Sequence, residues 1–487
     1  MKRKIPYYLL FVTLLMVHCQ MADAQIVIRD GVTVSQSLLI GTGLPLVDVV
    51  TVNGEEPACQ YVTAPPGAWG MSITQATKVP GRLRIYQNSD SPVYDSGEYD
   101  EHSHGMTIKI RGNTSAYRDK KPFKIKLATS DDLLLRNDVL CMDRDWLLIT
   151  DEELNVLSGL TLSKVLGMPW TPHFMYVNLV INNNYRGVYM LIESVKRNTN
   201  CRINVSGQGM LTEGDAYWWN EDFYIKSLLD SHYGFTFKYP DAERMSDADV
   251  AYFTDYLARF EQSLTCDNYE QYIDLNSFAL WCLAQDILGS WDSGGTNRYY
   301  ARYDRRPESL MVMPCLWDFD SNETTITNWS RCHTEHFTRL FNNSNPAFKL
   351  HYIRLWLTVC RALETEMCNR LNDFKESSQF WGLYYSTTYN NLRWNSHVVY
   401  SSILSQRAEW YGRRLPFLNK LVAKIHLPGD ANIDGSVDVV DVNTVINCML
   451  NRDDEKVIEA ACDVNADGHV DIADINQVIN LMLGAVK

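Results

Sequence analysis

Two short segments rich in Asp and Asn constrain the fold of this 487-residue chain more than any other feature. Residues 430–441 read DANIDGSVDVVD, and residues 463–474 read DVNADGHVDIAD, with their starts 33 positions apart. Both carry an oxygen-bearing side chain at positions 1, 3, 5, 9 and 12, and glycine at position 6. Ca²⁺ takes about six to eight oxygen ligands, and a loop with this spacing supplies them while the glycine permits a sharp turn. The repeat therefore predicts two calcium-binding loops rather than two unrelated polar turns.

One calcium ion is expected in each loop, with position 7 contributing a main-chain carbonyl. The predicted ligands are Asp430, Asn432, Asp434, Ser436, Asp438 and Asp441, then Asp463, Asn465, Asp467, His469, Asp471 and Asp474. Apolar residues at three- and four-residue spacing follow each loop, which predicts one helix after each. Residues 428–487, called the calcium module below, hold 12 acidic and 3 basic residues, so they carry −9 of the net charge of −14. Bound divalent cations would offset part of this charge.

Duplicated loops that end in Asp, each followed by one helix, resemble a type I dockerin over about residues 429–484. An ordinary EF-hand loop ends in Glu instead. The resemblance implies a calcium-dependent fold that docks to a cohesin-type receptor or a cell-surface scaffold protein. Loop positions 10 and 11 are often Ser/Thr-type recognition residues in cellulosomal dockerins, but here they are Val439-Val440 and Ile472-Ala473. This departure favours an apolar contact surface.

The start of the chain has the pattern of an export signal. Three basic residues at positions 2–4 precede an apolar stretch at 7–17, which is too short to span a bilayer. Small residues at 22 and 24 offer a cleavage site, so residues 1–24 are expected to be a signal peptide. Cys19 leaves a lipid anchor as an alternative, although no small residue precedes it. We expect a secreted or cell-surface protein without a transmembrane anchor, and the net negative charge argues against a nucleic-acid partner.

Residues 25–427, called the body below, change in pattern from strands to helices. Short alternating segments in the first part predict strands, including two hairpins formed by 107–111 with 123–127 and by 175–181 with 187–192. After about Ser246, helical spacing covers residues 250–264, 275–288, 352–371 and 398–422. The predicted class is α+β, with a strand-rich N-terminal part, a helical C-terminal part and a small all-α module.

The predicted division of the chain has four parts. The signal peptide spans 1–24, and a β-rich region at 25–100 leads into a main domain at 101–425. The module follows at 428–487, after a linker that contains Pro428 and Gly429.

An ordered series of motifs in the body resembles the CotH family. The series consists of IKIRGNTS at 108–115, KKPFKIKL at 120–127, DWLL at 145–148, YRGVY at 185–189 with Glu193, LTE at 211–213, KYP at 238–240 and WDFD at 317–320. CotH proteins are secreted or spore-coat atypical protein kinases. The resemblance therefore implies a kinase-like fold, ATP with Mg²⁺ or Mn²⁺, and phosphate transfer to Ser or Thr of a secreted protein substrate.

Three residues are predicted to carry the phosphate transfer. Asp292 and Asn297 have the spacing of the catalytic-loop Asp and Asn of protein kinases, where Asp accepts the hydroxyl proton and Asn holds metal. Asp318 follows the apolar run 310–315, so it is a candidate Mg²⁺ ligand at the end of a buried strand. Asp320 is a second possible metal ligand.

Phosphoryl transfer also needs cations beside the phosphates. The candidates in the body are Arg111, Lys121, Lys124 and Lys238. Glu213 or Glu193 is the expected ion-pair partner of Lys238. For each lysine the alternative is a solvated position on a strand.

One departure from the family pattern opens a second interpretation. Residues 151–157 read DEELNVL, where family members commonly carry DxSxxRN, so the Arg-Asn pair is absent. A catalytically inactive, kinase-like binding or scaffold protein is therefore an alternative to an active kinase. A glycan-degrading or glycan-binding component of a dockerin-assembled complex is a further alternative, although no paired-Glu motif stands out.

Overall fold

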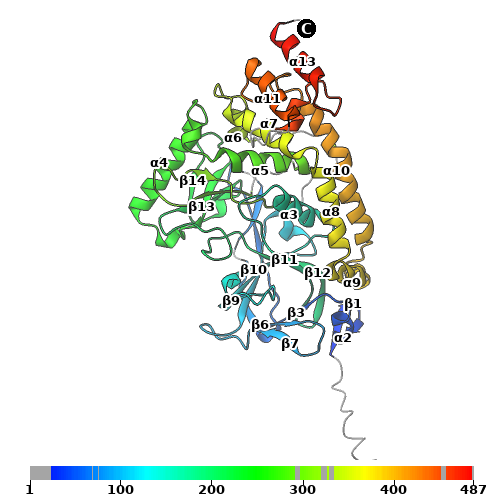
Figure 1. Cartoon of the computed structure of the whole chain (residues 1–487). Helices are drawn as coiled ribbons and strands as arrows, with labels where there is room; N and C mark the ends of the chain where they lie inside the picture. Colours follow the sequence, from blue (N-terminus) through cyan, green and yellow to red (C-terminus); the bar gives the residue numbers. More distant parts are fainter. Residues whose placement is uncertain are drawn as a thin grey trace, which may run out of the picture.

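The structure, a computed structural model, describes residues 24–68, 70–74, 76–290, 297–319, 326–327, 334–450 and 457–484. Within these ranges strands dominate the N-terminal part and helices the C-terminal part (Figure 1), which confirms the α+β prediction. The predicted signal peptide lies almost entirely outside the described residues. None of the helices in the described ranges is both long and apolar enough to cross a bilayer.

A closed β-barrel forms the N-terminal part. Its strands are β3 (Leu46–Thr51), β6 (Val79–Tyr86), β8 (Met106–Ile110), β9 (Phe123–Asp131), β10 (Asp143–Ile149), β11 (Phe174–Ile181) and β12 (Asn184–Glu193). They follow the order β10–β9–β8–β6–β3–β11–β12, and pairing of β10 with β12 closes the ring. The β3–β11 pair is parallel, and the other neighbours in the ring are antiparallel. Three further strands extend this sheet: β1 (Gln25–Arg29), β2 (Val32–Ser35) and β7 (Pro92–Asp95).

Alternation along the strands places one set of side chains in an apolar barrel interior and the other set outside it. Ile108 and Ile110 of β8 belong to the buried cluster inside the barrel, whereas Lys109 between them is only partly buried. Both predicted hairpins are confirmed, because β8 pairs with β9 and β11 pairs with β12. The second hairpin turns at Asn182 and Asn183, whose φ angles of 50° and 61° lie in the left-handed region that Asn tolerates.

A second sheet is separate from the barrel sheet. Its strands are β13 (Met210–Asp215), β14 (Tyr224–Lys226), β15 (Gly234–Tyr239), β16 (Arg298–Arg302) and β17 (Met311–Val312). They follow the order β14–β15–β13–β16–β17. The last two strands interrupt the part of the chain predicted to be helical, and they extend a sheet whose other strands come from before residue 240. β4 (Gln60–Thr63) and β5 (Met71–Thr74) form a small separate antiparallel pair.

The helices of the body pack around one large apolar core. They are α3 (Asn155–Val165), α4 (Asp247–Ser263), α5 (Leu275–Leu288), α6 (Glu335–Phe341), α7 (Ala347–Val359), α8 (Leu363–Lys375), α9 (Ser378–Trp394) and α10 (Tyr400–Val422), with a short α2 (Gln36–Ile40) near the barrel. The predicted helices at 250–264, 275–288 and 398–422 correspond to α4, α5 and α10. The predicted helix at 352–371 is instead two helices, α7 and α8, separated by a turn at residues 360–362.

The calcium module contains α11 (Val439–Met449), α12 (Glu459–Cys462) and α13 (Ile472–Met482). The helices predicted after the two loops are α11 and α13, and each begins within its loop sequence. Val445, Cys462 and Val478 are buried in the small core of the module. In Figure 1 the module lies at the top of the molecule, beside α7.

Candidate functional site

Asn297 and Asp318 are brought together by the fold. The side-chain amide of Asn297 donates a hydrogen bond to the carboxylate of Asp318. Both residues have φ in the left-handed region, at 64° and 65°. Asn and Asp adopt such angles more readily than other non-glycine residues, so both residue types suit these positions. The structure thus joins two of the predicted catalytic residues, while Asp292 and Asp320 lie outside the described residues.

The neighbours of Asp318 in the chain fix its position. Trp317 is 8% exposed and Phe319 is 2% exposed, so both rings are anchored in the core. The ring of Phe319 lies against Gly159 of α3, where an added Cβ would be 2.2 Å from the ring. No side chain larger than hydrogen fits there without displacing Phe319. The backbone at Asp318 therefore depends on a packing contact with a helix far away in the sequence.

Glu213 and Lys238 form an ion pair next to this site. The Lys238 ammonium lies 2.7 Å from a carboxylate oxygen of Glu213, so the structure selects Glu213 rather than Glu193 as its partner. Burial alone would lower the pKa of Lys238, but Glu213 raises it, and the net shift is upward. Lys238 is therefore held in its charged form. Tyr299 of β16 lies opposite Glu213 of β13, two residues after Asn297.

Asp215 is a candidate residue that the sequence prediction missed. It follows Glu213 by two positions on β13, so both side chains share one face of the sheet. The residue is 7% exposed, and its carboxylate accepts a hydrogen bond from the backbone N–H of Tyr217 at 2.8 Å. Burial, together with the negative charge of Glu213, raises the pKa of Asp215 to about 7. The acidic alternation at 213 and 215, shortly after the apolar Met210 and Leu211, was the signal that could have revealed it.

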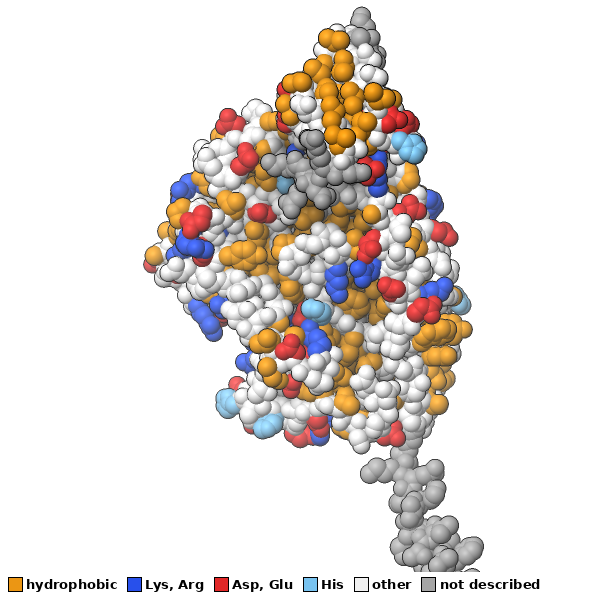
Figure 2. Space-filling view, in the orientation of Figure 1, with side chains coloured by type: hydrophobic (Ala, Val, Ile, Leu, Met, Phe, Trp, Pro, Cys, Tyr) orange, Lys and Arg blue, Asp and Glu red, His pale blue; other side chains and the backbone are white. Residues whose placement is uncertain are grey.

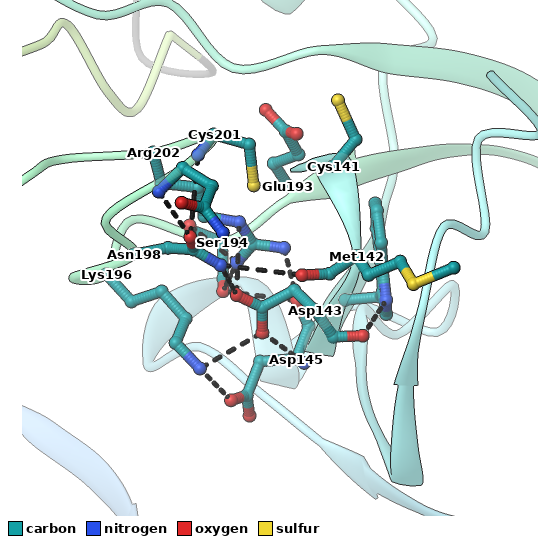
Figure 3. Close-up of polar contacts among 12 residues, drawn as sticks. Cys141, Met142, Asp143, Asp145, Glu193, Ser194, Lys196, Asn198, Cys201 and Arg202 are labelled. Atoms are coloured by element: carbon teal, nitrogen blue, oxygen red, sulfur yellow. Dashed lines mark hydrogen bonds and ion pairs between the residues drawn. The ribbon is translucent and has the colours of Figure 1, made fainter. Parts of the chain in front are cut away.

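Lys124 is one member of a charged network on the barrel. Its ammonium lies 2.9 Å from Asp145, which also pairs with Lys196 at 2.5 Å. Lys196 reaches Asp143 as well, at 3.1 Å (Figure 3). Burial would raise the pKa of Asp145, but Lys124 and Lys196 hold it below its usual range. Lys124 thus already has a carboxylate partner, and Asp143 and Lys196 are network members that the sequence did not predict.

Two other predicted residues, Lys121 and Glu193, have different surroundings. Lys121 donates to the backbone carbonyls of Ala116 and Arg118, at 2.8 and 3.2 Å, which ties it to a local turn. Glu193 is fully buried, an ion pair joins it to Arg136 at 3.0 Å, and Nδ1 of His173 lies 3.2 Å from its carboxylate. These contacts support structural roles for Lys121 and Glu193.

Arg111 follows β8 and lies close enough to Tyr299 of β16 for its charge to act on that hydroxyl. Its backbone N–H donates to the carbonyl of Pro122 at 3.1 Å, just beyond the β8–β9 pair. Burial raises the pKa of Tyr299, and the positive charge of Arg111 opposes this shift. Arg111 therefore contributes positive charge near the strand that follows Asn297.

The segment that lacks the family's Arg-Asn pair forms the start of α3. Asp151 is buried, and it accepts hydrogen bonds from the backbone N–H groups of Val156 and Leu157 at 2.9 and 3.0 Å. Burial raises the pKa of Asp151 to about 6, although these bonds oppose the shift. Arg407 of α10 donates to the side chain of Asn155 at 2.6 Å. A guanidinium from a distant helix therefore lies at this segment.

The first calcium loop is organised by its own hydrogen bonds. Asp430 accepts the backbone N–H groups of Asp434 and Gly435, both at 2.9 Å. Asp441 accepts those of Asn432 and Asp438, at 3.0 and 2.9 Å. Gly435 has a φ of 92°, which fits the sharp turn expected at position 6.

The second loop repeats this arrangement. Asp463 accepts the N–H groups of Asp467 and Gly468 at 3.1 and 3.0 Å, and Gly468 has a φ of 91°. Asp474 accepts those of Asn465 and Asp471 at 3.0 and 2.9 Å. At position 7 the backbone N–H groups of Ser436 and His469 each donate to the Asp two residues before, at 2.9 Å. Because the two loops share one sequence pattern, they adopt the same backbone conformation.

The chemistry of these loops fits calcium. Asp430, Asp441 and Asp474 are fully buried, and a buried carboxylate is costly unless positive charge offsets it. Within the described ranges no three carboxylate, imidazole or thiolate groups converge on one point. The match of the loops to calcium therefore depends on the backbone path of each loop and on its full set of oxygen ligands, including Asn side chains and main-chain carbonyls.

Two family models match the chain, one within the body and one within the calcium module. The family model for CotH kinase protein matches residues 108–376, which is more than half of the chain. The model for the dockerin type I domain matches residues 428–483. No curated protein matches the chain. Dockerin type I domains bind calcium, in agreement with the two loops. The chain belongs to the CotH kinase protein family and carries a C-terminal dockerin type I domain.

Proposed function

We propose that the body is an atypical protein kinase that transfers phosphate from ATP to Ser or Thr of an extracytoplasmic protein. The hydrogen bond between Asn297 and Asp318 is the observation that carries this proposal. It joins two oxygen-bearing side chains from separate segments within the match to the CotH family. An amide and a carboxylate are ligands that Mg²⁺ accepts.

The residues of the body divide into metal-holding and phosphate-facing groups. Asp318 and Asn297, with Asp320 as a further ligand, would hold Mg²⁺ or Mn²⁺. The metal would neutralise charge on the ATP phosphates. Lys238, kept charged by Glu213, and Arg111 would attract the phosphates. Lys124 shares Asp145 with Lys196, so its charge is partly offset.

Asp292 is proposed as the base that accepts the proton of the substrate hydroxyl group. Its spacing from Asn297 supports this role, because protein kinases place the base and the metal-holding Asn at that spacing. Replacement of Asp292 by Asn would then lower phosphate transfer without weakening ATP binding.

Incubation of the purified protein with labelled ATP and Mg²⁺ or Mn²⁺, with itself and mixed secreted proteins as acceptors, tests the proposal. We expect incorporation of label into Ser or Thr, and its loss in Asp318→Ala. The matched control is Asp373→Ala, which removes an exposed carboxylate on α8. Equal incorporation by Asp318→Ala and the wild type would contradict the assigned role of Asp318.

A non-catalytic binding or scaffold protein is the second candidate. The observation that favours it is the segment 151–157, which lacks the Arg-Asn pair of the family pattern. Metal-dependent ATP binding without phosphate transfer would identify this alternative. Cleavage or binding of polysaccharide without ATP binding would instead favour the glycan-directed alternative, for which the dockerin domain is the only support.

The dockerin domain is proposed to bind two calcium ions and to tether the protein to a cohesin-type receptor outside the cytoplasm. Figure 2 shows apolar side chains gathered on the module at the top of the view. Val439 and Ile472, at position 10 of the two loops, are 60% and 67% exposed, and Leu483 is 75% exposed. Contiguous exposed apolar side chains are typical of a protein interface. Binding of an immobilised cohesin, abolished by chelation of calcium, would test this tether.

A further inference from the structure

The calcium module packs directly on the body. Ile433, in the first loop, is 2% exposed and belongs to the large core of the body rather than to the core of the module. Ala461 of α12 belongs to the same large core. A Cβ placed on Gly435 would lie 3.5 Å from Leu350 of α7, an ordinary van der Waals distance. These contacts place both a calcium loop and α12 against the body.

Arg354 of α7 donates hydrogen bonds to the main chain of the first loop. Its guanidinium donates to the carbonyl of Asn432 at 2.8 Å and to that of Ile433 at 3.2 Å. These residues occupy positions 3 and 4 of the loop; Asn432 is itself a predicted calcium ligand, and Ile433 lies between it and the next ligand, Asp434. The contact depends on the path of the backbone that calcium would stabilise.

Arg361, in the turn after α7, forms an ion pair with a side chain of the second loop. Its guanidinium lies 3.0 Å from Oδ2 of Asp463 and 2.7 Å from Glu459. Asp463 is the first predicted ligand of the second loop, and the same Oδ2 accepts the N–H of Gly468. Arg361 is therefore a residue of the body that contacts a predicted calcium ligand.

The opposite face of α7 is fixed within the body. Tyr352 donates its hydroxyl to a carboxylate oxygen of Asp286 on α5, at 2.8 Å. The buried indole of Trp356 donates to Asn419 on α10, at 3.0 Å. One helix thus contacts the calcium loops on one side and two core helices on the other.

We propose that calcium binding in the module and the stability of the body are coupled through α7, with Arg354 and Arg361 as the coupling residues. This inference rests on the proposed calcium binding of the loops. A ligand that binds only the folded state stabilises every element whose contacts are lost when its site unfolds. Without calcium the acidic loops lose their order, and α7 loses the contacts of Ile433, Asn432 and Asp463. The dockerin domain then stabilises the body when calcium is bound, in addition to tethering the protein.

Tryptophan fluorescence can isolate the body in a test on the full chain. All 13 tryptophans lie before residue 428, so their emission reports only the unfolding of the body. We expect the thermal midpoint from this emission to rise by about 2–4 °C when chelator is replaced by millimolar calcium. In Asp441→Ala/Asp474→Ala, which removes a predicted ligand from each loop, the rise should disappear. Loss of the rise in this variant would show that calcium stabilises the body through the loops of the module.

The coupling residues are tested by Arg354→Ala/Arg361→Ala. We expect this variant to bind calcium in a calorimetric titration while its tryptophan midpoint no longer changes with calcium. Arg370→Ala is the matched control, because Arg370 is an exposed arginine of α8 whose guanidinium pairs with Glu366 of the same helix. Its calcium-dependent rise should equal that of the wild type.

Three results would overturn the inference, and they are distinguishable. Calcium binding by the wild type without any change in the tryptophan midpoint would overturn the coupling but leave the calcium sites intact. A full rise in Arg354→Ala/Arg361→Ala would overturn the role of the two arginines. Absence of calorimetric calcium binding would overturn the proposed calcium function together with the coupling.

Discussion

The calcium module and the nucleotide site proposed for the body assemble oxygen ligands by different means. Each loop of the module gathers its candidate ligands within twelve consecutive residues and orders them by its own backbone hydrogen bonds. The body joins Asn297 to Asp318 across 21 positions and depends on the contact of Phe319 with Gly159 for support. A local site can be damaged by a change in its own loop, whereas a non-local site is also sensitive to distant packing.

The largest expected effect lies in the local site. Asp441→Ala removes the final ligand of the first loop, and with it the acceptor for two loop N–H groups. We expect calcium affinity at this loop to fall on the order of 100-fold, because carboxylate ligands set the affinity of such sites. Isothermal titration calorimetry measures this change.

Asp438→Asn serves as the comparison for Asp441→Ala. Position 9 often acts through water, so the affinity should fall less there than in Asp441→Ala. Equal affinities in Asp441→Ala and the wild type would show that the loop does not bind calcium as proposed.

Gly159→Ala tests the non-local dependence of the body. Replacement of Gly by Ala in a helix ordinarily stabilises a protein by roughly 0.5–1 kcal/mol. Here the added Cβ would meet the Phe319 ring at 2.2 Å, so we expect destabilisation by about 1–3 kcal/mol. Urea unfolding followed by tryptophan fluorescence measures the free energy, and Mg²⁺-dependent ATP affinity should fall with it.

Gly207→Ala is the matched control, because a Cβ there would approach only the Tyr239 hydroxyl, at 4.0 Å. It should leave both stability and ATP affinity near the wild-type values. A stabilised Gly159→Ala variant with normal ATP affinity would contradict the proposed packing support for Asp318.

Asp215 predicts a pH dependence of stability. In the folded protein the carboxyl group of Asp215 keeps its proton up to about pH 7. In the unfolded chain the same group releases the proton near its ordinary pKa of 3.8. Stability therefore falls as the pH rises between these values, and the loss is complete above pH 7. Asp215→Asn removes this titration and can still accept the N–H of Tyr217. We expect the variant to gain about 1–3 kcal/mol relative to the wild type at pH 8 and nothing near pH 4.

Urea unfolding at the two pH values measures the effect of Asp215→Asn. Asp373→Asn, at an exposed position on α8, should show no pH-dependent gain. A gain of equal size for Asp215→Asn at both pH values would rule out the titration as its cause.

Lys121→Ala should have the smallest effect. Its ammonium is occupied by two backbone carbonyls, so we expect a loss of about 0.5–1.5 kcal/mol in stability and no change in ATP affinity. Lys238→Ala is the contrasting variant, for which ATP affinity should fall. A large loss of ATP affinity in Lys121→Ala would instead indicate that Lys121 contacts the ATP phosphates.

Local patterns allowed much of this molecule to be predicted from sequence. The calcium loops, both hairpins and the helices α4, α5 and α10 depend on neighbours within one segment, which periodicity and turn residues reveal. Closure of the barrel by β10 and β12, and the pairing of β16 with β13, join distant segments and leave no local signal. For the same reason the family motifs indicated Glu213 and Lys238 but not Asp215, and they did not reveal that Lys124 shares Asp145 with Lys196.

The central claim is that Asn297 and Asp318 form a metal-dependent nucleotide site in the body, separate from the calcium loops. Calorimetric titration of ATP in the presence of Mg²⁺, into the wild type and Asp318→Asn, tests it most directly. The account predicts Mg²⁺-dependent binding by the wild type and at least a tenfold loss in the variant, with calcium affinity unchanged. Equal ATP affinity in the two proteins, or no binding by the wild type, would contradict it.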